Sequence, residues 1–179
     1  MPKIIESTLI SLDGVFEHPH LWATKYFDSE AENYALELLS KSDAMLMGRR
    51  TYEFLAAAFP HQKGEYGQRV NTIRKYVFSS TLKKAEWGNS TIVDGDVATG
   101  IAKLKGQPGK DLVVYGHGLL GQTLLKHQLL DELKLWIHPC FVGVGKSLFH
   151  EGEKVNLKFI AQKTLGTGVL VATYQPVAT

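Results

Sequence analysis

Short β-rich segments alternate with helix-like segments along almost the whole chain. The strand-like segments before the last quarter of the sequence span residues 4–11, 44–48, 75–80, 91–93 and 111–115. Helical patterns begin near Ser29, Arg49, Val97 and Leu119, and the last of them ends near Leu130. Strands joined by helical crossovers form parallel sheets with helices on both faces. The alternation therefore predicts an α/β fold around a mostly parallel sheet.

The last quarter of the chain breaks this alternation. Residues 133–139, 155–163 and 169–174 all look like strands, and no helical pattern separates them. We therefore expect an antiparallel edge at the C-terminal end of the sheet. Elsewhere, residues 18–28 and 63–67 look like loops, and Ser29-Glu30-Ala31-Glu32 matches a capping box at a helix start.

Composition limits the class of protein. The 179 residues are 44% hydrophobic and 21% charged, which predicts one folded domain over residues 1–179. The net charge of +2 gives no sign of nucleic-acid binding, and no apolar run approaches the ~20 residues that span a membrane. The single cysteine, Cys140, and the lack of an N-terminal signal pattern predict a cytoplasmic protein.

The first motif with chemical potential is Met47-Gly48-Arg49-Arg50-Thr51, where a buried strand ends and a helix starts at once. A helix N-terminus offers unpaired amides and partial positive charge, which suit a phosphate. The two arginines and the threonine hydroxyl add donors. The alternative is a solvated helix start with ordinary basic residues.

The second motif is Gly116-His117-Gly118-Leu119-Leu120-Gly121, a G-x-G-x-x-G pattern between a strand and a helix. Glycines at such a turn let the backbone approach a pyrophosphate closely. The pattern lies late in the chain, and no acidic residue for the ribose follows about 20 positions later. A plain strand-to-helix turn is the alternative.

Further polar residues remain as candidates. Ser79 and Ser80 follow a strand, where hydroxyls bind a phosphate or cap a turn. Asp13 in a turn and Glu32 in a helix start are the candidate proton donors if burial raises the pKa of either. No spacing of histidines or cysteines indicates a metal site. Residues 143–147 resemble the end of a P-loop, but Cys140 stands where its first glycine belongs.

Taken in order, these segments resemble the dihydrofolate reductase superfamily over nearly the whole chain. The branch they resemble is the reductase domain of bifunctional riboflavin-biosynthesis deaminase–reductases. The residues that carry the resemblance are Ser11-Leu12-Asp13-Gly14, Met47 to Glu53, Asp131-Glu132-Leu133, Pro139, Val142 to Gly145, and Leu148-Phe149.

The resemblance implies an eight-stranded sheet, NADPH as hydride donor and a homodimer. It places the cofactor's phosphates at Arg49, Arg50 and Thr51 after Gly48, the adenosine 2′-phosphate at Ser79-Ser80, and the pyrophosphate at residues 116–120. An ungapped count from Gly48 puts Glu32 at the position of the acid that binds the pterin. The chain departs from the family in two respects: Gly116-His117 replaces Gly-Gly, and the proline-tryptophan pterin loop is missing.

Three hypotheses follow. The first is an NADPH-dependent reductase of a small heterocyclic or carbonyl/imine substrate, similar to the 5-amino-6-(5-phosphoribosylamino)uracil reductase of riboflavin biosynthesis. The second is a non-catalytic module that kept the fold, and the third is a flavin or other nucleotide binder that uses the same turns. All three require the helix starts after Gly48 and Gly118 to converge on one ligand.

Overall fold

The computed structural model describes residues 1–148 and 154–177 and contains an eight-stranded sheet. The strand order is β4-β3-β2-β5-β1-β6-β8-β7. The strands are β1 (Ile4–Ser11), β2 (Ser42–Gly48), β3 (Arg74–Phe78), β4 (Ser90–Val93), β5 (Asp111–Tyr115), β6 (Glu132–His138), β7 (Asn156–Thr164) and β8 (Leu170–Val177).

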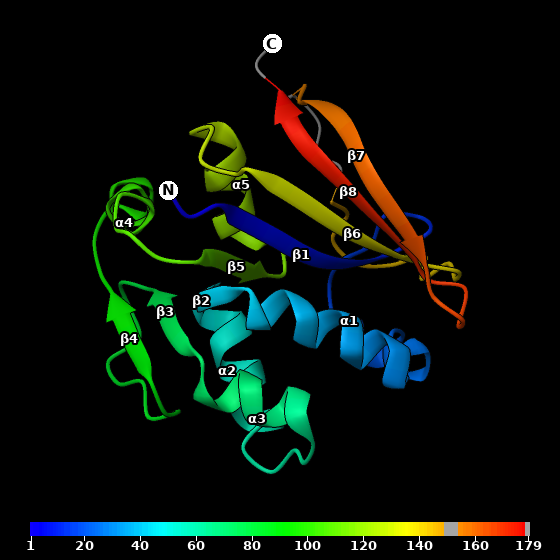
Figure 1. Ribbon diagram of the computed structural model, residues 1–179, viewed down its shortest axis with the longest axis horizontal. Helices are drawn as coiled ribbons and strands as arrows, with labels where there is room; N and C mark the ends of the chain where they lie inside the picture. The colour runs from blue at the N-terminus through cyan, green and yellow to red at the C-terminus, as the bar shows by residue number, and fades with distance from the viewer. Residues whose placement is uncertain (149–153, 178–179) are drawn as a thin grey trace.

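The six strands from β4 to β6 in this order are all parallel. The next strand, β8, pairs antiparallel to β6, and β7 pairs antiparallel to β8 at the sheet's outer edge. These pairings confirm the predicted α/β fold, the eight-stranded sheet and its antiparallel C-terminal edge. Figure 1 shows β7 and β8 extending beyond the region covered by helices.

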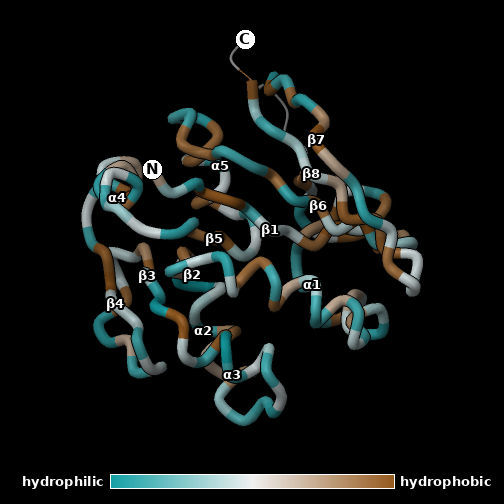
Figure 2. The backbone as a smooth tube through the Cα atoms, viewed as in Figure 1, coloured by the Kyte–Doolittle hydropathy of each residue, from teal (hydrophilic) through white to brown (hydrophobic). Residues whose placement is uncertain are grey.

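Helices cover both faces of the parallel part (Figure 1). One face carries α1 (Ser29–Ser40), α2 (Arg49–Ala58) and α3 (Glu65–Thr72), whose buried residues join one hydrophobic cluster with Met45 and Val113. The other face carries α4 (Val97–Lys105) and α5 (Gly118–Lys126), which pack over Leu46 and Val114. Neighbouring residues on one strand thus face opposite clusters, which is why the central strands are apolar at successive positions (Figure 2).

The start of α1 differs from the prediction. The N-cap is Asp28, whose carboxylate accepts hydrogen bonds from the amides of Glu30 and Ala31, at 3.1 and 3.0 Å. Ser29 is already the first helical residue, so the expected capping box at Ser29 and Glu32 is wrong by one position. The competing signal is an aspartate directly before the serine, since Asp caps a helix as well as Ser does.

Two predicted loops contain helical structure. The expected loop at residues 63–67 overlaps α3, which begins after Gly64 and packs Tyr66 and Val70 into the core. The segment 18–28 forms two short 3₁₀ turns, Pro19–Leu21 and Thr24–Tyr26. Tertiary packing against α1 stabilises α3 although a glycine lies within it.

The parallel arrangement decides where polar loops gather. Six strands point the same way, so the segments that follow β1, β2, β3, β5 and β6 all leave the sheet at one edge. We call this the carboxyl edge. In open α/β sheets, ligands bind outside this edge. In the part of the chain that the structure describes, no helix is long and apolar enough to cross a membrane.

Candidate functional site

Two helices begin at the carboxyl edge without a side-chain cap. The N-cap of α2 is Gly48, which has no side chain, and the N-cap of α5 is His117, whose side chain caps no amide. By contrast, the carboxylates of Asp28 and Asp96 cap α1 and α4. The first amides of α2 and α5 have no partner within their own helices. They are therefore available to an anion outside the sheet.

These two helix starts lie beside each other. They follow β2 and β5, which are neighbours in the sheet. A Cβ built on Gly116 would lie 3.7 Å from Thr51 Oγ1, so the turn after β5 faces the first turn of α2. Gly116 has a φ of +74° and Gly118 a φ of +50°, values that favour glycine. The two helix starts therefore lie side by side, and the peptide between Gly116 and His117 is trans.

The arginines after Gly48 point to a second part of the edge. Arg49 Nε donates to Glu53 at 2.7 Å, and its Nη1 donates to Thr81 Oγ1 at 3.0 Å. This contact joins the start of α2 to the loop after β3, so Arg49, Ser79 and Ser80 belong to one region. Arg50 is exposed, and no partner of its guanidinium is found within residues 1–148 and 154–177. Both arginines remain accessible to a phosphate.

The hydroxyl of Ser79 already has a structural role. Its Oγ accepts hydrogen bonds from the amides of Thr81 and Leu82, at 3.2 and 3.0 Å, which closes the turn after β3. Turn capping was the alternative that the sequence left open for this residue. Ser80 is exposed beside it.

The turn after β5 offers its backbone rather than its polar side chain. His117 and Leu120 are buried, whereas Leu119 is 82% exposed at the helix start. The imidazole of His117 points inward to Glu6 on β1, with 2.8 Å between Nδ1 and Oε1. No signal in the sequence identified Glu6 as its partner, because 111 residues separate the two.

Asp13 fastens two loops together. Its carboxylate accepts hydrogen bonds from the Ser11 hydroxyl at 2.5 Å, the Val142 amide at 3.1 Å and the Gly143 amide at 2.8 Å. The Ser11 hydroxyl, followed by these two amides, lowers the pKa of Asp13 to about 2. An acid that is ionised at neutral pH has no proton to donate. The geometry makes Asp13 a latch between the loops after β1 and β6, not a proton donor.

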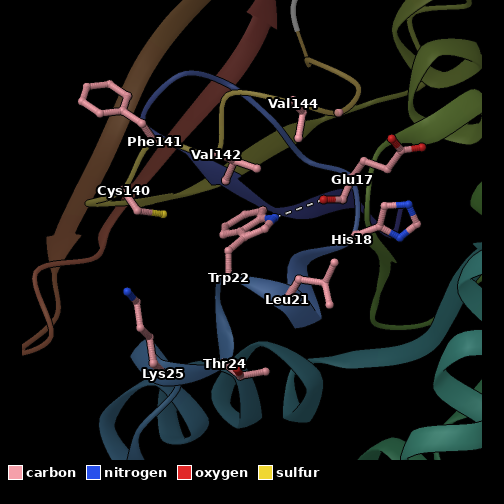
Figure 3. Close-up of a pocket in the computed structure, with 11 residues that line it drawn as sticks. Glu17, His18, Leu21, Trp22, Thr24, Lys25, Cys140, Phe141, Val142 and Val144 are labelled. Atoms are coloured by element: carbon pink, nitrogen blue, oxygen red, sulfur yellow. Dashed lines mark hydrogen bonds between the residues drawn. The ribbon is translucent and has the colours of Figure 1, made fainter.

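The loops joined by this latch line an open cavity of about 600 Å³ at the ends of β1 and β6. Figure 3 shows Trp22 near its centre, with the loop that carries Val142 and Val144 on one side and Leu21 on the other. The indole N–H of Trp22 donates to the Glu17 carbonyl at 3.1 Å, which fixes the ring. Leu21, Phe141 and Val144 are strongly exposed around the cavity, and exposed His18 and Lys25 also line it, so its rim is mixed in polarity.

His138 supports the floor of this region from the end of β6. Its ring packs edge-to-face against Trp22 and Tyr26, at centroid distances of 5.2 and 5.5 Å. Nδ1 lies within hydrogen-bond distance of the carbonyls of Trp136 and Ile10, and burial lowers the pKa of the imidazole. His138 is therefore a satisfied polar group on a strand.

The second candidate acid, Glu32, is exposed on α1. Its charge reaches Tyr66, whose hydroxyl lies 3.3 Å from that of Tyr115 at the end of β5. Burial raises the pKa of Tyr66 to about 12. The hydrogen bond to Tyr115 lowers this pKa, and the charge of Glu32 raises it further. Burial likewise raises the pKa of Tyr115, so both hydroxyls are protonated at neutral pH. No sequence pattern marked this tyrosine pair.

The comparison with known families decides the family. A family model described as the RibD C-terminal domain matches residues 2–171. The chain belongs to this family. Two relatives of this RibD-type domain, both from Bacillus subtilis strain 168, are the uncharacterized proteins YyaP and YwjB. YyaP is 28% identical over 96% of this chain and 94% of its own length, and YwjB is 25% identical over 93% and 94%.

Solved structures share the fold of the RibD-type domain. A putative riboflavin biosynthesis protein from Shewanella sp. PV-4 has a TM-score of 0.75 at 21% identity, covering 99% of this chain and 100% of its own. A pyrimidine reductase-like protein from Corynebacterium diphtheriae has a TM-score of 0.74 at 12% identity, covering 99% and 93%. The Thermotoga maritima diaminohydroxyphosphoribosylaminopyrimidine deaminase/5-amino-6-(5-phosphoribosylamino)uracil reductase has a TM-score of 0.67 at 15% identity. This chain covers 57% of that longer protein.

The resemblance to the riboflavin-type branch of the dihydrofolate reductase superfamily is confirmed by the family match and these folds. Phe149, one of the residues that carried it, falls outside the described residues. Within the described ranges, no three histidine, cysteine or acidic side chains are placed to hold a metal ion.

Proposed function

We propose that this RibD-type domain is an NADPH-dependent reductase of a small heterocyclic or carbonyl/imine substrate. The observation that carries the proposal is the pairing of two uncapped helix starts, with Thr51 Oγ1 3.7 Å from the Cβ position of Gly116. A pyrophosphate between them would receive amide hydrogen bonds from two helices at once. The family's reductase role agrees with this placement.

The carboxyl edge has the length of a dinucleotide. From β3 to β6, the order β3-β2-β5-β1-β6 contains four strand spacings, or roughly 19 Å at about 4.8 Å each. Arg49 and the loop at Ser79 and Ser80 lie at the β3 end and would hold the 2′-phosphate. Thr51 and the turn at residues 116–118 lie in the middle and would hold the pyrophosphate. The nicotinamide would then reach the β1 and β6 end, beside the cavity.

The cofactor would supply the hydride, and the chain's own residues would bind and orient both reactants. The cavity around Trp22 would receive the substrate, with apolar side chains and the charged side chains of Glu17 and Lys25 both in its lining. Asp13 holds one wall of that cavity through Val142 and Gly143. Asp13 is ionised and Glu32 is exposed, so neither carboxyl group meets the condition of burial on which its role as a proton donor depended.

The use of Asp13 as a latch also favours a second candidate, a non-catalytic nucleotide- or flavin-binding module on the same fold. One of the two candidate acids then serves structure alone. Turnover of NADPH with a panel of pteridines, quinones, aldehydes and imines separates the two proposals. Cofactor binding without oxidation of NADPH by any compound favours the binding module, and a yellow colour on purification favours a flavin.

The Arg49→Ala variant tests the cofactor assignment. Loss of a charged hydrogen-bond donor to a phosphate weakens binding by about 10- to 100-fold. We therefore expect fluorescence titration to show much weaker NADPH binding and nearly unchanged NADH binding, since NADH lacks the 2′-phosphate. Arg74→Ala is the matched control, because Arg74 is exposed at the opposite end of β3 and contacts Tyr76. Failure of the wild-type protein to bind NADPH at millimolar concentration would remove the proposal.

A further inference from the structure

A carboxylate and an imidazole are buried together beneath the turn after β5. The side chains of Glu6 and His117 are 0% and 3% exposed, and 2.8 Å separates Oε1 from Nδ1. Thr8 Oγ1 donates to the same Oε1 at 2.9 Å. Oε2 of Glu6 has no hydrogen-bond partner in the described part of the chain. Oε1 therefore carries both contacts.

Such a pair is costly to bury unless its geometry is held closely. The surroundings hold it. Phe16 packs edge-to-face on the His117 ring, with 5.7 Å between centroids. A Cβ at Gly121 would clash with that ring and would lie 2.6 Å from Glu6 Oε2, so the first turn of α5 has glycine where the pair needs space. The last glycine of the G-x-G-x-x-G pattern thus makes room for the pair.

The pair changes what the N-cap of α5 does. Polar N-cap side chains usually turn back and occupy the first free amides of the helix. The His117 side chain turns inward to β1 instead, and it caps none of these amides. A second contact, from the Gly116 amide to the Ser7 carbonyl at 3.2 Å, ties the same turn to the same strand. The amides of Gly118, Leu119 and Leu120 stay available at a turn fastened at two points.

We infer that His117 and Glu6 act as positioning residues for the cofactor pyrophosphate, fixing the turn at residues 116–118 in its binding orientation. The inference rests on the proposed function. The buried imidazole of His117 contacts the Glu6 carboxylate on β1 and so holds the turn in place. Without this contact, the backbone geometry of Gly116-His117 alone would set the orientation of the turn. Neither side chain touches the cofactor, so the effect passes through the backbone amides.

The test compares the wild-type protein with His117→Gly, Glu6→Gln and the double variant. Each binds two probes in calorimetry: NADPH, which spans the whole edge, and adenosine 2′-monophosphate, which has no pyrophosphate. His127→Gly is the matched control, because His127 is exposed at the other end of α5. We expect either single variant to bind NADPH about 10- to 100-fold more weakly, with binding of adenosine 2′-monophosphate unchanged. The double variant should be no weaker than the worse single variant, because the two residues act as one unit.

Phosphorus NMR gives a readout that a general loss of stability would not move. The pyrophosphate resonances of bound NADPH should shift in the variants, and the 2′-phosphate resonance should stay in place. Equal weakening of both probes, or wild-type affinity in Glu6→Gln and His117→Gly, would overturn the positioning role. Absence of NADPH binding by the wild-type protein itself would instead overturn the proposed function, and the inference with it.

Discussion

Asp13 shows how one exposed side chain sets the shape of the cavity. Its pKa of about 2 lies below the ordinary value of 3.8, so folding favours the ionised form. The stabilisation is fully present above pH 3.8 and is lost as the pH falls toward 2. The Asp13→Asn variant lacks this charge at every pH. We predict that wild type exceeds the variant in free energy of unfolding at pH 6, and that the gap closes between pH 4 and pH 2.

Urea denaturation at a series of pH values measures this gap. The amides of Val142 and Gly143 should also exchange with deuterium faster in Asp13→Asn, because they lose their charged acceptor. If the difference in free energy of unfolding between wild type and Asp13→Asn stays constant from pH 6 to pH 2, these donors do not stabilise the ionised carboxylate.

The first turn of α1 tests which residue caps the helix. Asp28 receives two amide hydrogen bonds, and Ser29 lies inside the helix. We predict that Asp28→Ala lowers the free energy of unfolding by about 1 kcal/mol, the usual effect of removing an N-cap. Ser29→Ala is the matched control and should change it by a few tenths at most. Urea denaturation compares the two variants. A larger loss of free energy of unfolding in Ser29→Ala would show that Ser29 is the cap, as the sequence indicated.

The elements that the sequence predicted well are those with strong local signals. The bounds of β1 and β5 and the start of α4 agree with the expected segments, because apolar runs and turn residues define these ends. The α3 helix was missed, because its glycines and polar residues look like a loop until Tyr66 and Val70 meet the core. Lys75 begins a predicted strand, yet it is fully buried, with Nζ donating to three carbonyls.

The features of the candidate site were likewise predictable from the sequence only in part. The turns after Gly48 and at Gly116 were predictable, because glycine and basic residues at a strand-to-helix junction form a local pattern. The Glu6–His117 pair, the Asp13 latch and the Tyr66–Tyr115 pair were not, since each joins residues far apart in the chain. Such contacts depend on the strand order, which local patterns leave undetermined.

For the whole molecule, the edge strand β7 is the surface where we propose that a homodimer forms. All nine of its residues are exposed, and Leu157, Phe159 and Ile160 are large and apolar. Its outer edge also presents unpaired backbone groups, which can pair with another strand. A second copy of this chain fits, because two β7 strands related by a twofold axis would pair antiparallel and bury the same apolar residues on both sides.

The Phe159→Lys variant tests this surface. Phe159 is 55% exposed and packs on Tyr174, so the monomer should tolerate a lysine at this position. In the proposed dimer, the lysines of the two copies would repel each other across the interface. We predict a dimer mass for the wild-type protein and a monomer mass for the variant in analytical ultracentrifugation at micromolar concentration. Phe54→Lys is the matched control and should stay dimeric, because Phe54 is similarly exposed and lies on α2, which Figure 1 shows far from β7. A monomeric wild-type protein would contradict the homodimer, and a dimeric Phe159→Lys variant would place the interface on another surface.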